Sequence, residues 1–246
     1  MNKLFIFFVF LFLSISTSVF SDDGSHWGYS GAKGPQHWGG LSSVFSVCST
    51  GKNQSPINLS EFTEGELDPI SLKYIQAGSS VLNNGHTIQV NYDKNSFISI
   101  NHHTFELIQF HFHVPSENHI NGKSFPMEAH FVHADKKGNL AVIAVMFEEG
   151  KLHTELAKVW KHLPMRAGNK NQLQTKVSAS ALLPAKKDYY RFNGSLTTPP
   201  CTEGVWWLVM KDSTSVSTGQ LKKFIQAIKH SNNRPIQATN ARMIVK

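Results

Sequence analysis

Residues 110–119 of the chain read FHFHVPSENH and combine a β-strand pattern with closely spaced imidazoles. Phe110 and Phe112 alternate with His111 and His113, so in an extended strand the phenylalanines point to one face and the histidines to the other. One face is then apolar, as a core requires, and the opposite face presents two imidazoles together. The segment therefore predicts a core strand that also carries a candidate metal site.

The segments around this strand also have the composition of strands. Turn signals at residues 93–95, 121–123 and 136–139 separate several of them, which favours antiparallel pairing of neighbours. The run AVIAVMF does not alternate and predicts a strand covered on both faces. The predicted strands lie within residues 81–92, 96–101, 104–114, 127–135 and 140–147.

Helical periodicity is clear in only two segments. Apolar residues between Leu152 and Leu163 fall on one helix face before Pro164, and the pattern recurs at residues 221–228 after a Ser217/Thr218 cap. The fold class we expect is mainly β (α+β). It should be a single domain with a large central, mostly antiparallel twisted sheet and a few peripheral helices.

The N-terminus has the layout of a secretory signal peptide. Lys3 precedes a strongly apolar run, which is followed by serine-rich sequence up to Ser21. The apolar run is shorter than the roughly 20 residues that a membrane-spanning helix needs. We therefore predict a signal peptide at residues 1–21 and one domain at residues 22–246, exported to the periplasm or secreted.

The two cysteines indicate a disulfide, and the distribution of charge bears on nucleic-acid binding. In an oxidising compartment, Cys48 and Cys201 tend to close into a disulfide. The rival interpretation, a pair of metal-binding thiolates, is disfavoured because neither residue has a CxxC companion. The net charge is +7, but the lysines are dispersed and no nucleic-acid-binding motif accompanies them. We interpret the charge as a solvated basic surface and expect no nucleic-acid partner.

A third histidine can complete a metal site. In the segment EAHFVH, Glu128, His130 and Val132 share one face of a strand, and His130 can form a triangle with His111 and His113 if the two strands are neighbours. Three neutral imidazoles suit Zn²⁺ and leave a fourth position for water, as in catalytic zinc sites. The HxH pattern also occurs in strands that bind no metal, so these residues alone leave a metal-free site open.

Two polar residues lie where they could orient the imidazoles. Gln109 and Glu128 each precede a predicted ligand by two residues, on the same strand face. Metal-binding histidines usually donate their second ring N–H to such an acceptor. The alternative is a polar pair on a solvated face.

The segment GSLTTPP (194–200) is one of several motifs through which the chain resembles an α-class carbonic anhydrase of the compact bacterial type. The resemblance runs from about Trp27 to Arg242, and an ordered set of motifs is more specific than any single one. The other motifs are HWGY (26–29), NQSPINL (53–59), LNNGH (82–86), QFHFHVPSEN (109–118), EAHFVH (128–133) and NNRP (232–235).

The resemblance implies a reaction and a ligand set. His111, His113 and His130 are implied to hold Zn²⁺, whose bound hydroxide attacks carbon dioxide to give bicarbonate and a proton. Glu117 and Thr197 correspond to a hydrogen-bonding gate. An ionised Glu117 can only accept, so the Thr197 hydroxyl donates to it and its oxygen accepts from the hydroxide.

The resemblance also implies a substrate wall and a proton route. His86 corresponds to the proton shuttle, a role that suits an imidazole because it titrates near neutral pH. Taken by themselves, the wall residues would be interpreted as core packing and His86 as a turn residue. An esterase side activity and a homodimer are further possibilities. The implied substrate-binding residues are Val132, Val142, Leu196, Thr198 and Trp207.

Secreted members of the family also have a disulfide that matches Cys48 and Cys201. No apolar tail follows at the C-terminus of the sequence, which implies export without a membrane anchor. The chain departs from the animal members at Asn118, where they have histidine, so the hydrogen bonds around Glu117 are expected to differ.

The histidine pattern is also compatible with two other classes of protein. The pattern His111-x-His113-x₃-Glu117 followed by Gly122 resembles half of a cupin motif, in which Glu117 would be a ligand of iron or manganese. No second cupin motif follows. A non-enzymatic zinc-binding relative is the other reading, but the chain retains every residue of the implied reaction centre.

Overall fold

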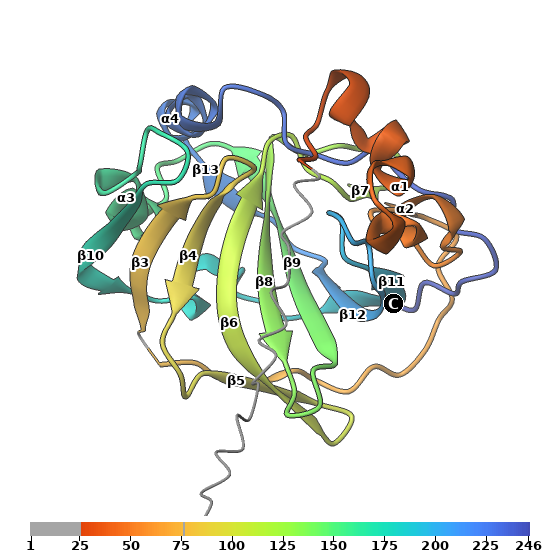
Figure 1. Cartoon of the computed structure of the whole chain (residues 1–246). Coiled ribbons are helices and arrows are strands. Elements are labelled where there is room, and N and C mark those ends of the chain that lie inside the picture. Colours follow the sequence, from red (N-terminus) through yellow and green to blue (C-terminus); the bar gives the residue numbers. More distant parts are fainter. Residues whose placement is uncertain (1–25, 76) are drawn as a thin grey trace, which may run out of the picture.

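The computed structural model describes residues 26–75 and 77–246 (Figure 1). The predicted signal peptide, residues 1–21, lies outside the described residues. Eleven strands form one large sheet. These strands are β2 (Ser71–Lys73), β3 (Gly78–Asn83), β4 (Ile88–Tyr92), β5 (Phe97–Ile100), β6 (His103–His113), β8 (Met127–Ala134), β9 (Leu140–Glu149), β10 (Lys170–Val177), β11 (Tyr189–Ser195), β12 (Glu203–Met210) and β13 (Thr214–Val216).

The order across the sheet is β10-β3-β4-β6-β8-β9-β12-β11, with β5 pairing β6 and β2, and β13 pairing β9. The strand pairs of this sheet are antiparallel, except that β12 and β13 each pair with β9 in parallel. A separate parallel pair joins β1 (Asn58–Leu59) to β7 (His119–Ile120). The prediction of a mainly β, mostly antiparallel fold is confirmed.

Four short α-helices accompany the sheet in the described part of the chain. They are α1 (Trp38–Leu41), α2 (Val47–Thr50), α3 (Thr154–Lys161) and α4 (Thr218–Ile228), and the 3₁₀ turns are η1 (Gly31–Lys33), η2 (Pro35–His37), η3 (Ser43–Phe45) and η4 (Ser180–Leu182).

Helices α3 and α4 are the two that the periodicity predicted. Helix α4 begins after Ser217, whose hydroxyl accepts from the Gln220 N–H while the Gln220 side chain accepts from the Ser217 N–H. No helix among the described residues combines the length and apolar character needed to span a bilayer.

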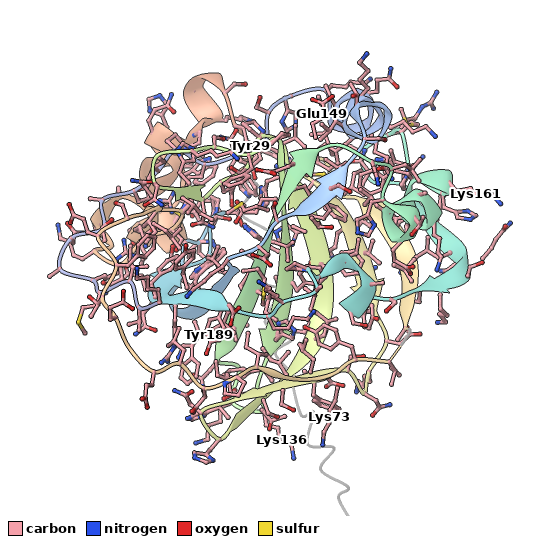
Figure 2. All side chains as sticks on the ribbon, turned by 180° about the vertical axis from the view of Figure 1, so that it is seen from behind. Tyr29, Lys73, Lys136, Glu149, Lys161 and Tyr189 are labelled. Atoms are coloured by element: carbon pink, nitrogen blue, oxygen red, sulfur yellow. A yellow bond between two sulfur atoms is a disulfide. The ribbon has the colours of Figure 1, made fainter. Side chains whose placement is uncertain are left out.

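The sheet has an apolar core on each face. Phe110, Phe112 and Phe131 belong to the larger cluster, which includes Trp160 of α3 and Phe224 of α4. The smaller cluster lies on the opposite face. Residues 141–147 of β9 contribute alternately to both clusters and are all buried, so the predicted two-sided burial of this strand is confirmed. The side chains of Lys73 and Lys136 lie at the bottom of the view from behind, and that of Lys161 lies away from them near α3 (Figure 2).

The disulfide joins the N-terminal helices to the loop after β11. Cys48 and Cys201 are bonded, with their Cα atoms 5.0 Å apart and a sequence separation of 153. Closing a loop of that length restricts the unfolded chain and contributes on the order of 5 kcal/mol in the chain-entropy model. The bonded cysteines form a third apolar cluster with the buried Trp38. The predicted pairing is confirmed.

His133, on β8, is fully buried and forms hydrogen bonds through both ring nitrogens. Its Nδ1 lies 3.1 Å from the Ala141 carbonyl oxygen, which can only accept, so Nδ1 carries the proton. Its Nε2 therefore accepts from the Tyr74 hydroxyl at 2.5 Å. Burial lowers the pKa of His133 to about 4, so the ring is neutral in the folded protein at neutral pH.

We expect this histidine to make the fold less stable in acid. In the unfolded chain the imidazole titrates near 6.5, so between that pH and about pH 4 only the unfolded state takes up a proton. The free energy of unfolding therefore decreases as pH falls through this range, by about 3 kcal/mol in total. Urea unfolding between about pH 7 and pH 4 measures the effect. A His133→Gln variant, which cannot titrate there, should show a flatter pH dependence, and an equal slope in both proteins would contradict the assignment.

Candidate metal centre

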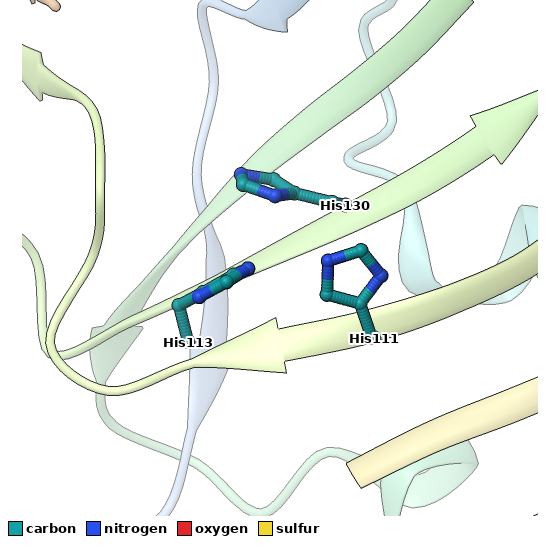
Figure 3. Close-up of side chains that lie close together, drawn as sticks. All are labelled: His111, His113 and His130. Carbon is teal, nitrogen blue, oxygen red and sulfur yellow. The ribbon is translucent and has the colours of Figure 1, made fainter. Parts of the chain in front are cut away.

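The pairing of β6 with β8 brings the three predicted ligands together. The register places His111 directly opposite His130, and His113 lies two residues further along β6. Figure 3 shows the three rings gathered beside these strands. One ligand atom from each ring lies within 4.8 Å of the other two. The strand adjacency on which the predicted triangle depended is therefore present.

Each ring has one nitrogen within 3 Å of an oxygen acceptor, although the contact of His130 does not have the geometry of a hydrogen bond. Because carbonyl and carboxylate oxygens accept hydrogen bonds, that nitrogen carries the proton and the other nitrogen keeps its lone pair. The contacts join Nδ1 of His111 to Oε1 of Gln109 (2.9 Å), Nδ1 of His113 to the Asn232 carbonyl oxygen (2.6 Å) and Nε2 of His130 to Oε1 of Glu128 (2.9 Å).

The remaining nitrogens form a donor set that fits a metal ion. They are Nε2 of His111, Nε2 of His113 and Nδ1 of His130. Nε2 of His113 is buried and has no hydrogen-bond partner within the described residues, a state that a bound cation would relieve. Burial lowers the pKa of all three imidazoles, so they are neutral at physiological pH, as ligation requires.

Glu128 holds several groups around the centre. Its Oε2 accepts from the backbone N–H groups of Glu117 (2.7 Å) and Asn118 (2.8 Å), and its Oε1 accepts from the Asn118 side chain (2.7 Å). Burial raises the pKa of Glu128, and the hydrogen bonds from Asn118 lower it. At the position where the sequence departs from animal relatives, Asn118 thus supplies a donor to the carboxylate that faces His130.

Glu117 and Thr197 lie together beside the histidines. Glu117 is 1% exposed, and its Oε2 lies 3.5 Å from Nε2 of His113. Burial raises the pKa of Glu117 well above its usual range, while a hydrogen bond from the Arg234 N–H and the Thr197 hydroxyl close by lower it. The Arg234 N–H donates to Oε1 at 2.8 Å. Oε2 of Glu117 has no hydrogen-bond partner among the described residues, so the gate between Glu117 and Thr197 that the resemblance implied stays a prediction.

Residues 232–235 contribute contacts that the sequence did not predict. The guanidinium of Arg234 is buried and donates to the carbonyl oxygens of Ser55 (2.8 Å) and Cys48 (2.9 Å), which links the Glu117 contact to the disulfide. The Asn232 carbonyl holds His113, and its side chain donates to the carbonyl oxygens of His86 (3.0 Å) and Phe112 (2.9 Å). Membership of the NNRP motif was their only signal in the sequence.

A cavity of about 140 Å³ connects His86 with the centre. The predicted shuttle residue thus shares a cavity with two of the predicted ligands. The ring of His86 stacks on Trp27 at 3.7 Å between centroids and an interplanar angle of 11°. Residues that line the cavity include Trp27, Tyr29, His86, His111, His113 and Thr198.

The predicted wall residues share one apolar cluster on the metal side of the sheet. Val142 and Trp207 are buried, and Val132 and Leu196 are partly buried against the same cluster. The Trp207 ring lies 4.9 Å from the His130 ring between centroids. The structure therefore provides an apolar surface that borders the three histidines.

The fold and this centre agree with comparisons to known proteins. Residues 33–246 match the family described as eukaryotic-type carbonic anhydrase. The chain is 51% identical over 223 residues to a carbonic anhydrase of Neisseria gonorrhoeae, covering 90% of this chain and 88% of that protein. It is 47% identical to one of Pectobacterium carotovorum, with 96% of both chains covered.

The solved structures give the same answer. The α-carbonic anhydrase from Thermovibrio ammonificans, determined with sulfanilamide, superposes with a TM-score of 0.89 at 48% identity, covering 91% of this chain and all of that one. The fold and the sequence thus agree with these proteins along most of the described chain. The chain belongs to the α-class, eukaryotic-type carbonic anhydrases and is a carbonic anhydrase enzyme.

Proposed function

We propose that the three-histidine centre binds Zn²⁺ and that the chain uses it to hydrate carbon dioxide reversibly to bicarbonate and a proton. The observation that carries this proposal is the set of three clustered, neutral imidazoles, each with one ring nitrogen within 3 Å of an oxygen acceptor. Such a nitrogen-only set suits zinc, and Glu117, the extra ligand of the cupin interpretation, lies outside it.

When bound, zinc supplies the nucleophile by lowering the pKa of a water molecule to about 7 in carbonic anhydrases. The chain supplies the orientation of the ligands. Gln109 and Glu128 fix the rings of His111 and His130, and the Asn232 carbonyl fixes His113.

Glu117 and Thr197 would aim the nucleophile. A cation at the centre, together with the nearby charge of Arg234, favours the ionised form of the buried Glu117 carboxylate. The Thr197 hydroxyl then donates to Glu117, and its oxygen is left to accept a hydrogen bond from the nucleophile. The direction of that hydrogen bond fixes which way the attacking lone pair points.

Val132, Val142, Leu196 and Trp207 would receive the apolar substrate, because their cluster borders His130 and offers carbon dioxide a surface that binds water poorly. Thr198, which lines the cavity, is the polar group proposed beside them. Carbon dioxide would therefore rest against the apolar cluster beside His130, and the cavity lined by His86 would connect the centre to solvent.

His86 would export the proton. Its ring lines the same cavity as His111 and His113, and it is partly exposed. Burial lowers its pKa, as do the neighbouring charges of His230 and His26. An imidazole that titrates slightly below its usual range can take a proton from the centre and release it quickly to buffer.

Export is proposed from the N-terminal pattern and the disulfide, and N-terminal sequencing of the exported protein would test residue 22 as its start. An esterase side activity and a homodimer stay predictions. Hydrolysis of an activated aryl ester and sedimentation velocity would test them.

Removing the metal should abolish activity. Chelation of the purified protein is expected to eliminate carbon dioxide hydration, measured by stopped flow with a pH indicator, and stoichiometric Zn²⁺ should restore it. Metal analysis should find one zinc per chain in the active protein. Full restoration by iron or manganese but not by zinc would contradict the proposed cofactor.

Loss of the Gln109 side chain should weaken zinc binding. Because Gln109→Ala leaves Nδ1 of His111 without its acceptor, we expect a decrease in zinc affinity of roughly 10- to 100-fold in competition with a chelator. Gln89→Ala is the matched control, since Gln89 lines the same cavity but donates to Asn91. Equal affinities in both variants would refute the orienting role.

Thr197→Val should separate metal binding from turnover. Valine has nearly the shape of threonine but no hydroxyl, so kcat/KM for hydration should fall about 100-fold or more while zinc content stays unchanged. Steady-state kinetics at saturating buffer measures the loss. An unchanged kcat/KM would remove Thr197 from the proposed role.

His86→Ala should slow proton export only. We expect a severalfold decrease in kcat at low buffer concentration, recovery with added imidazole, and an unchanged kcat/KM, because the conversion of carbon dioxide precedes proton export. A variant that matches the unmodified enzyme at low buffer would argue against His86 as the shuttle.

A further inference from the structure

A second histidine lies close to the segment that carries His86 and has no role in the reaction described above. His230 is exposed and follows α4. Its Nε2 lies 3.3 Å from the carbonyl oxygen of Gly85, the residue that precedes His86. Tyr29 connects the two histidines, with its ring centroid 5.7 Å from the His230 ring and 6.4 Å from the His86 ring.

The surroundings of the His230 ring suit its protonated form. Nδ1 lies 2.9 Å from the Ser231 carbonyl oxygen, and Nε2 faces the Gly85 carbonyl oxygen. A carbonyl oxygen can only accept, so both contacts are hydrogen bonds at the same time only when both ring nitrogens carry a proton. The ring can therefore take up a proton and gain a hydrogen bond when it does so.

The surroundings of His86 are different. One face of its ring is covered by Trp27, and burial lowers its pKa, with the charges of His230 and His26 lowering it further. These are the titratable groups that act on His86, and Lys229 is the charged residue next to His230 in the chain. Burial of the His86 ring thus disfavours its protonated form, which favours onward transfer of the proton.

We propose that His230 is a second proton-relay residue, which receives protons from His86 through water and passes them to buffer outside the cavity. In this step protonated His86 returns to its neutral form, neutral His230 becomes the imidazolium, and a buffer base then removes that proton. The proposal rests on the shuttle role of His86 and adds the next acceptor to it. His230 has no contact with the metal centre among the described residues and acts only through His86.

The test compares His230→Ala, His86→Ala and the double variant in carbon dioxide hydration at low and high buffer concentration. We expect His230→Ala to lower kcat severalfold at low buffer, to recover with added imidazole, and to keep kcat/KM and zinc content unchanged. In a serial relay, the double variant should be no slower than His86→Ala. His103→Ala is the matched control, because His103 is an exposed histidine at the opposite end of β6 from His113.

A second readout does not depend on activity. Because the charge of His230 lowers the pKa of His86, NMR titration of the histidine ring signals should find a higher His86 pKa in His230→Ala than in the unmodified protein. If His230 had only a structural role, the rise in the His86 pKa would not be accompanied by a loss of kcat at low buffer concentration.

The outcomes separate the relay from the shuttle. If His86→Ala lowers kcat at low buffer and His230→Ala does not, the relay is wrong and the shuttle role of His86 stands. The same conclusion follows if His26→Ala, rather than His230→Ala, lowers kcat at low buffer. No defect in His86→Ala overturns the shuttle and the relay with it. An additive loss in the double variant overturns transfer in series, since it means that the two histidines work independently.

Discussion

The register between β6 and β8 is the constraint on which the metal centre depends. It sets His111 against His130 and leaves His113 at the end of β6, so three imidazoles share one face of the sheet. The same register sends Phe110, Phe112 and Phe131 to the opposite face, where they are buried in the larger core. Because side chains alternate along a strand, a shift of one residue would exchange these sets and expose the phenylalanines. Core packing thus holds the ligands in place.

Beyond the ligands, the centre is an arrangement of oxygen acceptors. Gln109 and the Asn232 carbonyl each accept one imidazole N–H, which fixes the tautomers of His111 and His113, and Oε1 of Glu128 lies 2.9 Å from Nε2 of His130. Glu128 also accepts the backbone N–H of Glu117, so one buried carboxylate lies against both a proposed ligand and the proposed partner of Thr197. A disturbance at Glu128 would therefore reach metal binding and substrate attack together.

The strand pattern was sufficient to predict much of this centre. Alternation placed His111 and His113 on one face, and the spacing before each ligand pointed to Gln109 and Glu128. The two helices followed from periodicity and a cap, since those signals are local. Arg234 and Asn232 were not predicted, because their contacts with Glu117 and His113 span 117 and 119 residues and depend on the path of a segment without regular structure. Likewise, the stacking of His86 on Trp27 joins segments that no local pattern relates.

The contact between Asn232 and His113 also has a consequence for the order of assembly. During synthesis, His111, His113 and His130 leave the ribosome about a hundred residues before the carbonyl that fixes His113, as the 119-residue separation requires. A metal ion that bound at that stage would find imidazole rings that still rotate, so either ring nitrogen could bind it. Selective loading therefore belongs to the completed chain, after its last segment has closed over the sheet.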